Sequence, residues 1–105
     1  MNDTEQQLEA ARAFLMERDN GNPAKVRQMI EVVGKAARAM VTLIGMIEDE
    51  DDPEVVEILV DSMQEVDASM IASFGGKPRN VRDLIRAGVG DNATIRDKCI
   101  AMGIV

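Results

Sequence analysis

Histidine, tryptophan and tyrosine are absent from this chain, and Phe14 and Phe74 are its only aromatic residues. Histidine is the commonest general acid–base and the commonest metal ligand in proteins. Its absence excludes Ser-His and Cys-His nucleophile pairs, and zinc sites that need histidine or several cysteines from one chain. We therefore expect a protein without catalytic residues, without a bound metal and without a cofactor.

Cysteine is almost absent as well, because Cys99 is the only one. A single cysteine cannot form a disulfide within its own chain, and it indicates a reducing compartment such as the cytoplasm. Ile95 and Met102 stand at helical spacing around Cys99. This pattern predicts a thiol in an apolar core rather than a nucleophile.

Long hydrophobic runs are missing too. The longest uncharged run covers only residues 39–47, whereas a membrane-spanning helix needs about 20 apolar residues. The first seven residues, MNDTEQQ, are polar and acidic and do not have the pattern of a signal peptide. We expect a cytoplasmic protein that does not bind membranes.

What the chain does contain is typical of one small globular domain. Its 105 residues are 46% hydrophobic and 30% charged, with eight methionines and a net charge of −7. This length allows a single domain, 1–105, with one modest core. Methionine is flexible, so it suits adaptable contacts between helices.

Two cap-then-proline pairs predict two long helices. Asn22-Pro23 should open a helix that ends near Glu48, and Asp52-Pro53 should open one that ends near Phe74. Because the connection is short, the helices should form an antiparallel hairpin. An earlier helix is expected over 5–18, with Thr4 as its N-cap, Gln7 completing a capping box, and Asn20-Gly21 as its end.

The apolar side of the helix 22–48 covers close to half its circumference, which is more than one neighbouring helix can bury. A second copy of the chain is the simplest cover. We therefore expect a homodimer or higher oligomer, with self-association through Met29, Val33, Met40 and Ile44.

The Arg-Asp pattern occurs twice, in NVRD (80–83) and TIRD (94–97). Each reads as a capping residue followed three positions later by an acid, which predicts short helices over 81–88 and 95–102. The positive charge of residues 77–98, with six Lys and Arg against three Asp, would suit DNA binding. A DNA-binding helix-turn-helix, however, would place Asp83 and Asp97 at positions that need apolar packing residues. The expected fold is all-α and bundle-like, with a hairpin region 1–76 and a C-terminal subregion 77–105.

The loop FGGKPRNVR (74–82) gathers positive charge beside a predicted helix N-terminus. Free N–H groups at such a terminus favour anions, so a phosphate or nucleotide site is one interpretation. A helix end followed by a helix start, with solvated charges, is the alternative. The candidate anion-binding residues are Lys77, Arg79, Asn80 and Arg82.

Acidic residues follow the helix after Pro53 on the side opposite its apolar face. They are Glu54, Glu57, Asp61 and Glu65. We interpret them as a solvated face, and alternatively as an acidic surface for a basic partner, because a magnesium site would need acids that point inward from a second helix. Asp67 is the exception, since it falls among apolar positions and should meet an arginine or a helix N-terminus.

These features favour a small non-enzymatic protein-interaction module: an adaptor, inhibitor or regulator, of the kind common among accessory proteins of phages and mobile elements. Its expected partners are itself and an unidentified protein. The alternatives are an oligomeric binder of an anionic small molecule such as a nucleotide, and a small DNA-binding regulator using residues 77–98. A magnesium-dependent phosphohydrolase is the weakest alternative.

Overall fold

The computed structural model describes residues 2–18 and 22–105, and within these residues all regular structure is helical. The predicted all-α fold class is confirmed, with long helices preceding two short C-terminal ones, whereas self-association stays a prediction. The elements are α1 (Asn2–Arg18), α2 (Pro23–Asp49), α3 (Pro53–Ser73), α4 (Val81–Ala87), the 3₁₀ helix η1 (Gly90–Thr94) and α5 (Arg96–Ala101).

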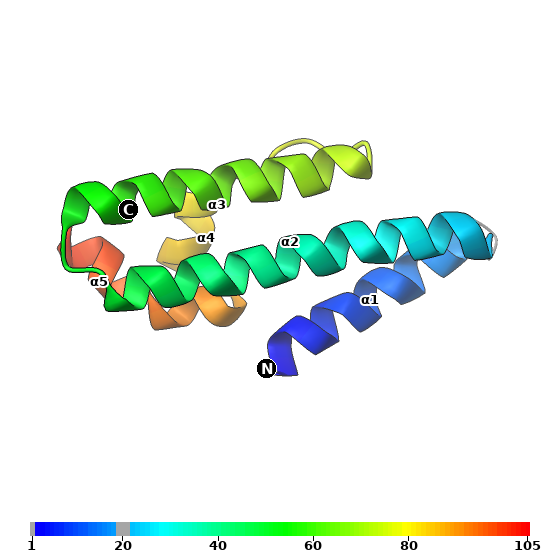
Figure 1. Cartoon of the computed structure of the whole chain (residues 1–105), viewed down its shortest axis with the longest axis horizontal. Helices are drawn as coiled ribbons and strands as arrows, with labels where there is room; N and C mark the ends of the chain where they lie inside the picture. Colours follow the sequence, from blue (N-terminus) through cyan, green and yellow to red (C-terminus); the bar gives the residue numbers. More distant parts are fainter. Residues whose placement is uncertain (1, 19–21) are drawn as a thin grey trace.

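Helices α2 and α3 form the predicted antiparallel hairpin (Figure 1). Each begins as its sequence predicts, with a capping side chain followed by proline. The Asn22 side chain accepts a hydrogen bond from Lys25 N at 3.3 Å, and Asp52 accepts one from Glu54 N at 2.9 Å. Both caps satisfy N–H groups that have no partner inside the helix.

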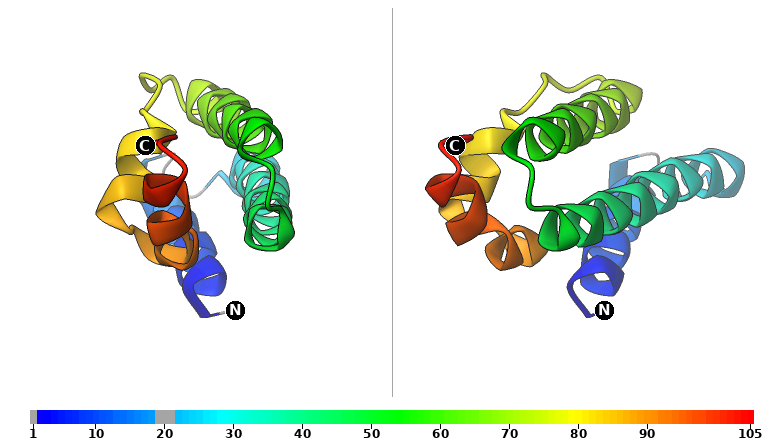
Figure 2. Two further views of the ribbon diagram at one scale, coloured as in Figure 1. Left: turned by 90° about the vertical axis from the view of Figure 1, so that its left-hand side faces the viewer. Right: turned by 60° about the vertical axis from the view of Figure 1, so that its left-hand side comes forward.

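The core lies at the half of the hairpin nearest its turn. There α4, η1 and α5 cover one side of α2 and α3, as Figures 1 and 2 show from three directions. Cys99 is fully buried in this core, as its spacing predicts. The largest fully buried side chains are Ile47, Met63, Ile85, Ile95, Val56, Val60, Val81 and Cys99.

Two predicted N-caps are wrong. Helix α1 already begins at Asn2, so Thr4 lies inside it, and the Thr4 hydroxyl donates to Asp91 Oδ2 at 3.2 Å. Helix α5 begins at Arg96 without a capping side chain. The Thr94 hydroxyl instead lies 3.2 Å from Glu48 Oε1 and 2.9 Å from the Asp91 carbonyl oxygen. The Thr4 hydroxyl thus has a distant partner, and the Thr94 hydroxyl has one distant and one local acceptor, neither of which is a cap contact.

The first Arg-Asp stretch does behave as predicted. Asn80 caps α4 by accepting a hydrogen bond from Asp83 N at 3.3 Å. Gly88 then ends α4 at a φ of +66°, a conformation that favours glycine. The predicted end of the first helix at Asn20-Gly21 lies outside the described residues.

The chain is elongated, with principal extents of 46 × 25 × 19 Å. None of the helices in the described ranges combines the length and apolar character needed to cross a bilayer.

Candidate functional site

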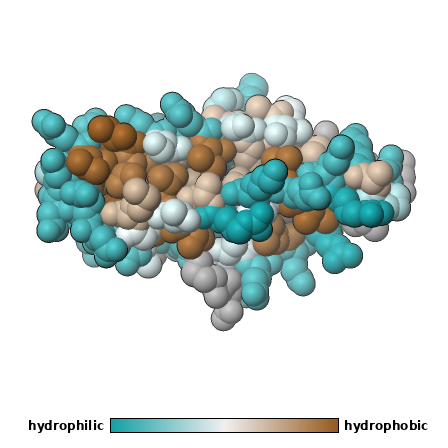
Figure 3. Space-filling model, viewed as in Figure 1, coloured by the Kyte–Doolittle hydropathy of each residue, from teal (hydrophilic) through white to brown (hydrophobic). Residues whose placement is uncertain are grey.

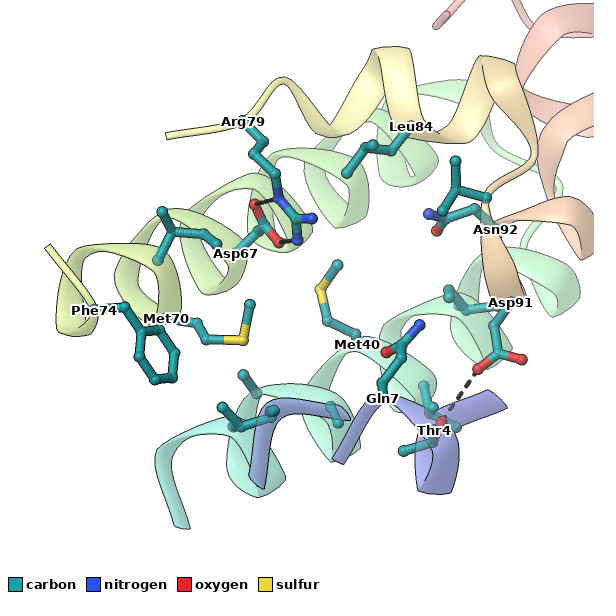
Figure 4. A pocket seen from close by; sticks show the side chains of 18 residues that line it. Thr4, Gln7, Met40, Asp67, Met70, Phe74, Arg79, Leu84, Asp91 and Asn92 are labelled. Atoms are coloured by element: carbon teal, nitrogen blue, oxygen red, sulfur yellow. Dashed lines mark hydrogen bonds and ion pairs between the residues drawn. The ribbon is translucent and has the colours of Figure 1, made fainter. Parts of the chain in front are cut away.

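An apolar cleft of about 510 Å³ opens among α1, α2, α3, α4 and η1 (Figure 4). Met40 of α2 and Met70 of α3 extend into the space between their helices. The volume falls within the ~300–1,000 Å³ typical of binding pockets. Other apolar side chains that line the cleft are Val33, Ala37, Val41, Ile44, Ile71, Phe74 and Leu84.

The cleft exists because α1 and α3 pack on different sides of α2. Helix α1 packs along α2, while α3 packs on α2 and α4, and in residues 2–18 and 22–105 no comparable packing joins α1 to α3. The end-on view in Figure 2 shows α1 and α3 lying apart. The apolar sector of α2, which is wider than one neighbour can bury, therefore contributes a long wall to the cleft.

Asp67 and Arg79 supply the charged groups in one wall. Asp67 is only 3% exposed, and Arg79 donates to both of its carboxylate oxygens, with Nε at 3.2 Å from Oδ2. The hydrogen bonds to Asp67 raise the pKa of the Arg79 guanidinium, although its partial burial acts in the opposite direction. The predicted arginine partner of Asp67 is thus confirmed, and the pair adds no net charge to the cleft.

The other polar groups lie where η1 meets α1. Thr4 binds Asp91 there, and Gln7 and Asn92 also line the cleft (Figure 4). The Asn92 Oδ1 atom is buried and accepts no hydrogen bond within the described part of the chain. The sequence pattern did not predict these residues, because a polar residue before α5 looks like any turn residue. A bound group with an N–H or O–H could satisfy this oxygen.

The candidate anion-binding residues lie together on the α3–α4 connection, but most already have partners. Lys77 is exposed, Arg79 binds Asp67, and Asn80 caps α4. Arg82 Nη2 lies 2.8 Å from Asp61 and 3.9 Å from Glu57. An anion would therefore have to displace carboxylates, and anion binding stays a prediction.

The predicted acidic surface is divided by the same contacts. Glu57 and Asp61 face Arg82, whereas Glu54 and Glu65 are exposed and form no ion pair with the described residues. The acidic stripe of α3 and the basic loop before α4 thus partly neutralise each other.

The residues predicted for self-association lie at different depths. Val33 and Ile44 are 7% and 6% exposed within the single chain, and both line the cleft with the half-buried Met40. Met29 is also half-buried, but it borders a separate shallow hollow with Lys25 and Val32. Of the four predicted residues, Val33, Met40 and Ile44 therefore lie on one candidate binding surface, and Met29 lies on another.

Metal-ligating side chains do not converge in the part of the chain that the structure describes. No set of three or more Cys, Asp or Glu in residues 2–18 and 22–105 is placed to hold a metal ion. Burial raises the pKa of the Cys99 thiol, an effect that the nearby Lys98 opposes. A buried, protonated thiol is a poor nucleophile.

Comparison of the chain with protein-family models, with curated proteins and with solved structures found no match. The residues and their geometry are thus the basis for a functional proposal.

Proposed function

We propose that this protein is a non-enzymatic interaction module that binds the apolar face of a partner helix in the cleft. The observation that carries this proposal is the apolar cleft between two helices, α1 and α3, that both pack on α2 and, within the described residues, make no comparable packing with each other. A helix placed there would contact both and complete a four-helix arrangement. Binding of an amphipathic helix in such a groove is a recurrent mode of protein recognition.

The shape of the cleft favours a helix over a compact ligand. Its α2 wall includes positions from Val33 to Ile44, which corresponds to about 16 Å at a rise of ~1.5 Å per residue. This length matches about three turns of a bound helix. Met40 and Met70 lie in the middle of the cleft, where flexible side chains can adapt to different apolar partners.

The charge pattern gives less support to the two alternatives, an oligomeric binder of an anionic small molecule and a DNA-binding regulator. Arg79 and Arg82 already contact carboxylates, which disfavours a strong anion site. Arg86 and Arg96 pair with Asp83 and Asp97, so the segment 77–98 offers little unpaired positive charge for DNA phosphates. A role as adaptor, inhibitor or regulator, as in small accessory proteins of phages and mobile elements, fits a module that acts only by binding.

The test uses a synthetic 18-residue helical peptide with leucine on one face and glutamine on the other, and fluorescence anisotropy as the readout. We expect the double variant M40Q/M70Q to bind the peptide at least about tenfold more weakly, because apolar anchors dominate such interfaces. The matched control M46Q/I58Q changes a methionine of α2 and an apolar residue of α3 that are both exposed outside the cleft. It should bind as the wild type does.

Two results would contradict the proposal. One is peptide binding that M40Q/M70Q leaves unchanged, and the other is a wild-type chain that does not bind the peptide. Circular dichroism of each variant verifies that the helices are intact. A small apolar dye that binds with the same dependence on Met40 and Met70, in the absence of peptide binding, would identify the cleft as a small-molecule site instead.

A further inference from the structure

The outer face of the hairpin carries exposed apolar side chains near its turn, on the side away from α4 and α5. Met46 of α2 is 50% exposed and Ile58 of α3 is 63% exposed. Leu43 and Val55 precede them by three residues and are half-buried, with part of each side chain packed against the core. We name these four residues the turn patch. Figure 3 shows apolar atoms gathered on this face over the turn half of the hairpin.

The hairpin segments that carry the turn patch are acidic. Two basic side chains reach them from other elements: Arg82 faces Glu57 and Asp61, and Lys98 donates to the Glu48 carbonyl oxygen. Residues 39–76 contain ten Asp and Glu and no Lys or Arg. Hydrophilic atoms border the apolar area at the turn end of the molecule (Figure 3). An apolar area with a polar, charged rim is typical of a surface that binds another protein.

Some of these carboxylates have structural roles within the fold. Asp52 caps α3, Glu50 Oε1 accepts a hydrogen bond from Asp52 N at 3.1 Å, and Glu57 and Asp61 face Arg82. Other acids at the turn end do not have such roles. They are Asp49, Asp51 and Glu54, which are exposed and form no ion pair with the described residues.

We infer that the turn patch binds a basic amphipathic helix of another protein. Apolar side chains of that helix would cover Met46 and Ile58, and its Lys or Arg residues would lie beside Asp49, Asp51 and Glu54. Charge complementarity decides the occupant. A second copy on a two-fold axis would bring the same unpaired carboxylates together, which is unfavourable. This surface is separate from the cleft, so one chain could hold two helical partners.

The probe is an 18-residue helical peptide with leucine on one face and lysine on the other. In a chain whose cleft is altered by M40Q/M70Q, adding M46Q/I58Q should weaken the binding of this peptide at least about tenfold, because one or two apolar anchors contribute most of the affinity of such a contact. D49N/D51N/E54Q should weaken it about fivefold in low salt and remove most of its dependence on salt concentration. These variants leave Glu50 and Asp52 unchanged, so the helix cap is preserved.

The controls separate this inference from the proposed function. M40Q/M70Q serves as the background for every measurement with this peptide, because the cleft of the proposed function would itself bind a leucine face. A peptide with the same leucine face and glutamates in place of the lysines should bind at least about tenfold more weakly. In the M40Q/M70Q background, equal binding of the lysine and glutamate peptides would overturn the inference, and so would binding of the lysine peptide that M46Q/I58Q leaves unchanged.

Discussion

A single buried carboxylate organises the connection between α3 and α4. Asp67 is 3% exposed, and both of its oxygens accept hydrogen bonds from Arg79, which stands just before α4. Gln64 secures the same segment, because its side chain donates to the Arg79 carbonyl oxygen at 2.6 Å and accepts from Val81 N at 2.8 Å. The two polar side chains of α3 thereby position α4 against the core.

Arg79→Met should destabilise the fold by about 2 kcal/mol, because it leaves a buried carboxylate without its charged hydrogen-bond donor. The double variant D67L/R79M removes both charges and should recover most of that loss. Urea unfolding followed by circular dichroism measures both effects. A double variant that is as unstable as R79M would show that Arg79 stabilises the fold by packing rather than through Asp67.

At the scale of the helices, local sequence predicts a boundary well when its hydrogen bond is local. The caps Asn22, Asp52 and Asn80 each bond to a backbone N–H two or three residues away, and all three were predicted. Thr4 bonds to a residue 87 positions away, and Thr94 bonds both to Glu48, 46 positions away, and to the carbonyl oxygen of Asp91, three positions away. No local pattern contains the distant partners, so their cap predictions are wrong.

The matched variants N80A and T94A test this distinction. N80A removes a real cap and should cost about 1 kcal/mol of stability. T94A should cost less than that, because its hydroxyl makes exposed hydrogen bonds and no helix cap. Urea midpoints of both variants provide the comparison. If T94A costs as much as N80A, and does so equally in a Glu48→Ala background, the Thr94 hydroxyl stabilises the fold independently of Glu48, as a cap of α5 would.

At the scale of the whole molecule, the sequence predicted part of the site. The wide apolar sector of α2 identified Val33, Met40 and Ile44, which line the cleft. Gln7, Leu84 and Asn92 were missed because they reach the cleft only through the relative placement of α1, α4 and η1. That placement depends on contacts such as Thr4 with Asp91, which join the two ends of the chain.

The same cleft makes self-association testable. Sedimentation equilibrium should detect a homodimer if a helix of a second copy occupies the cleft, and M40Q/M70Q should then raise the dissociation constant at least about tenfold. M46Q/I58Q is the control, because the acidic surroundings of the turn patch disfavour a second copy there. A wild-type chain that stays monomeric at every concentration would contradict self-association. The apolar wall from Val33 to Ile44 would then be free for a helix from a different protein, and peptide binding would distinguish that outcome from an inert cleft.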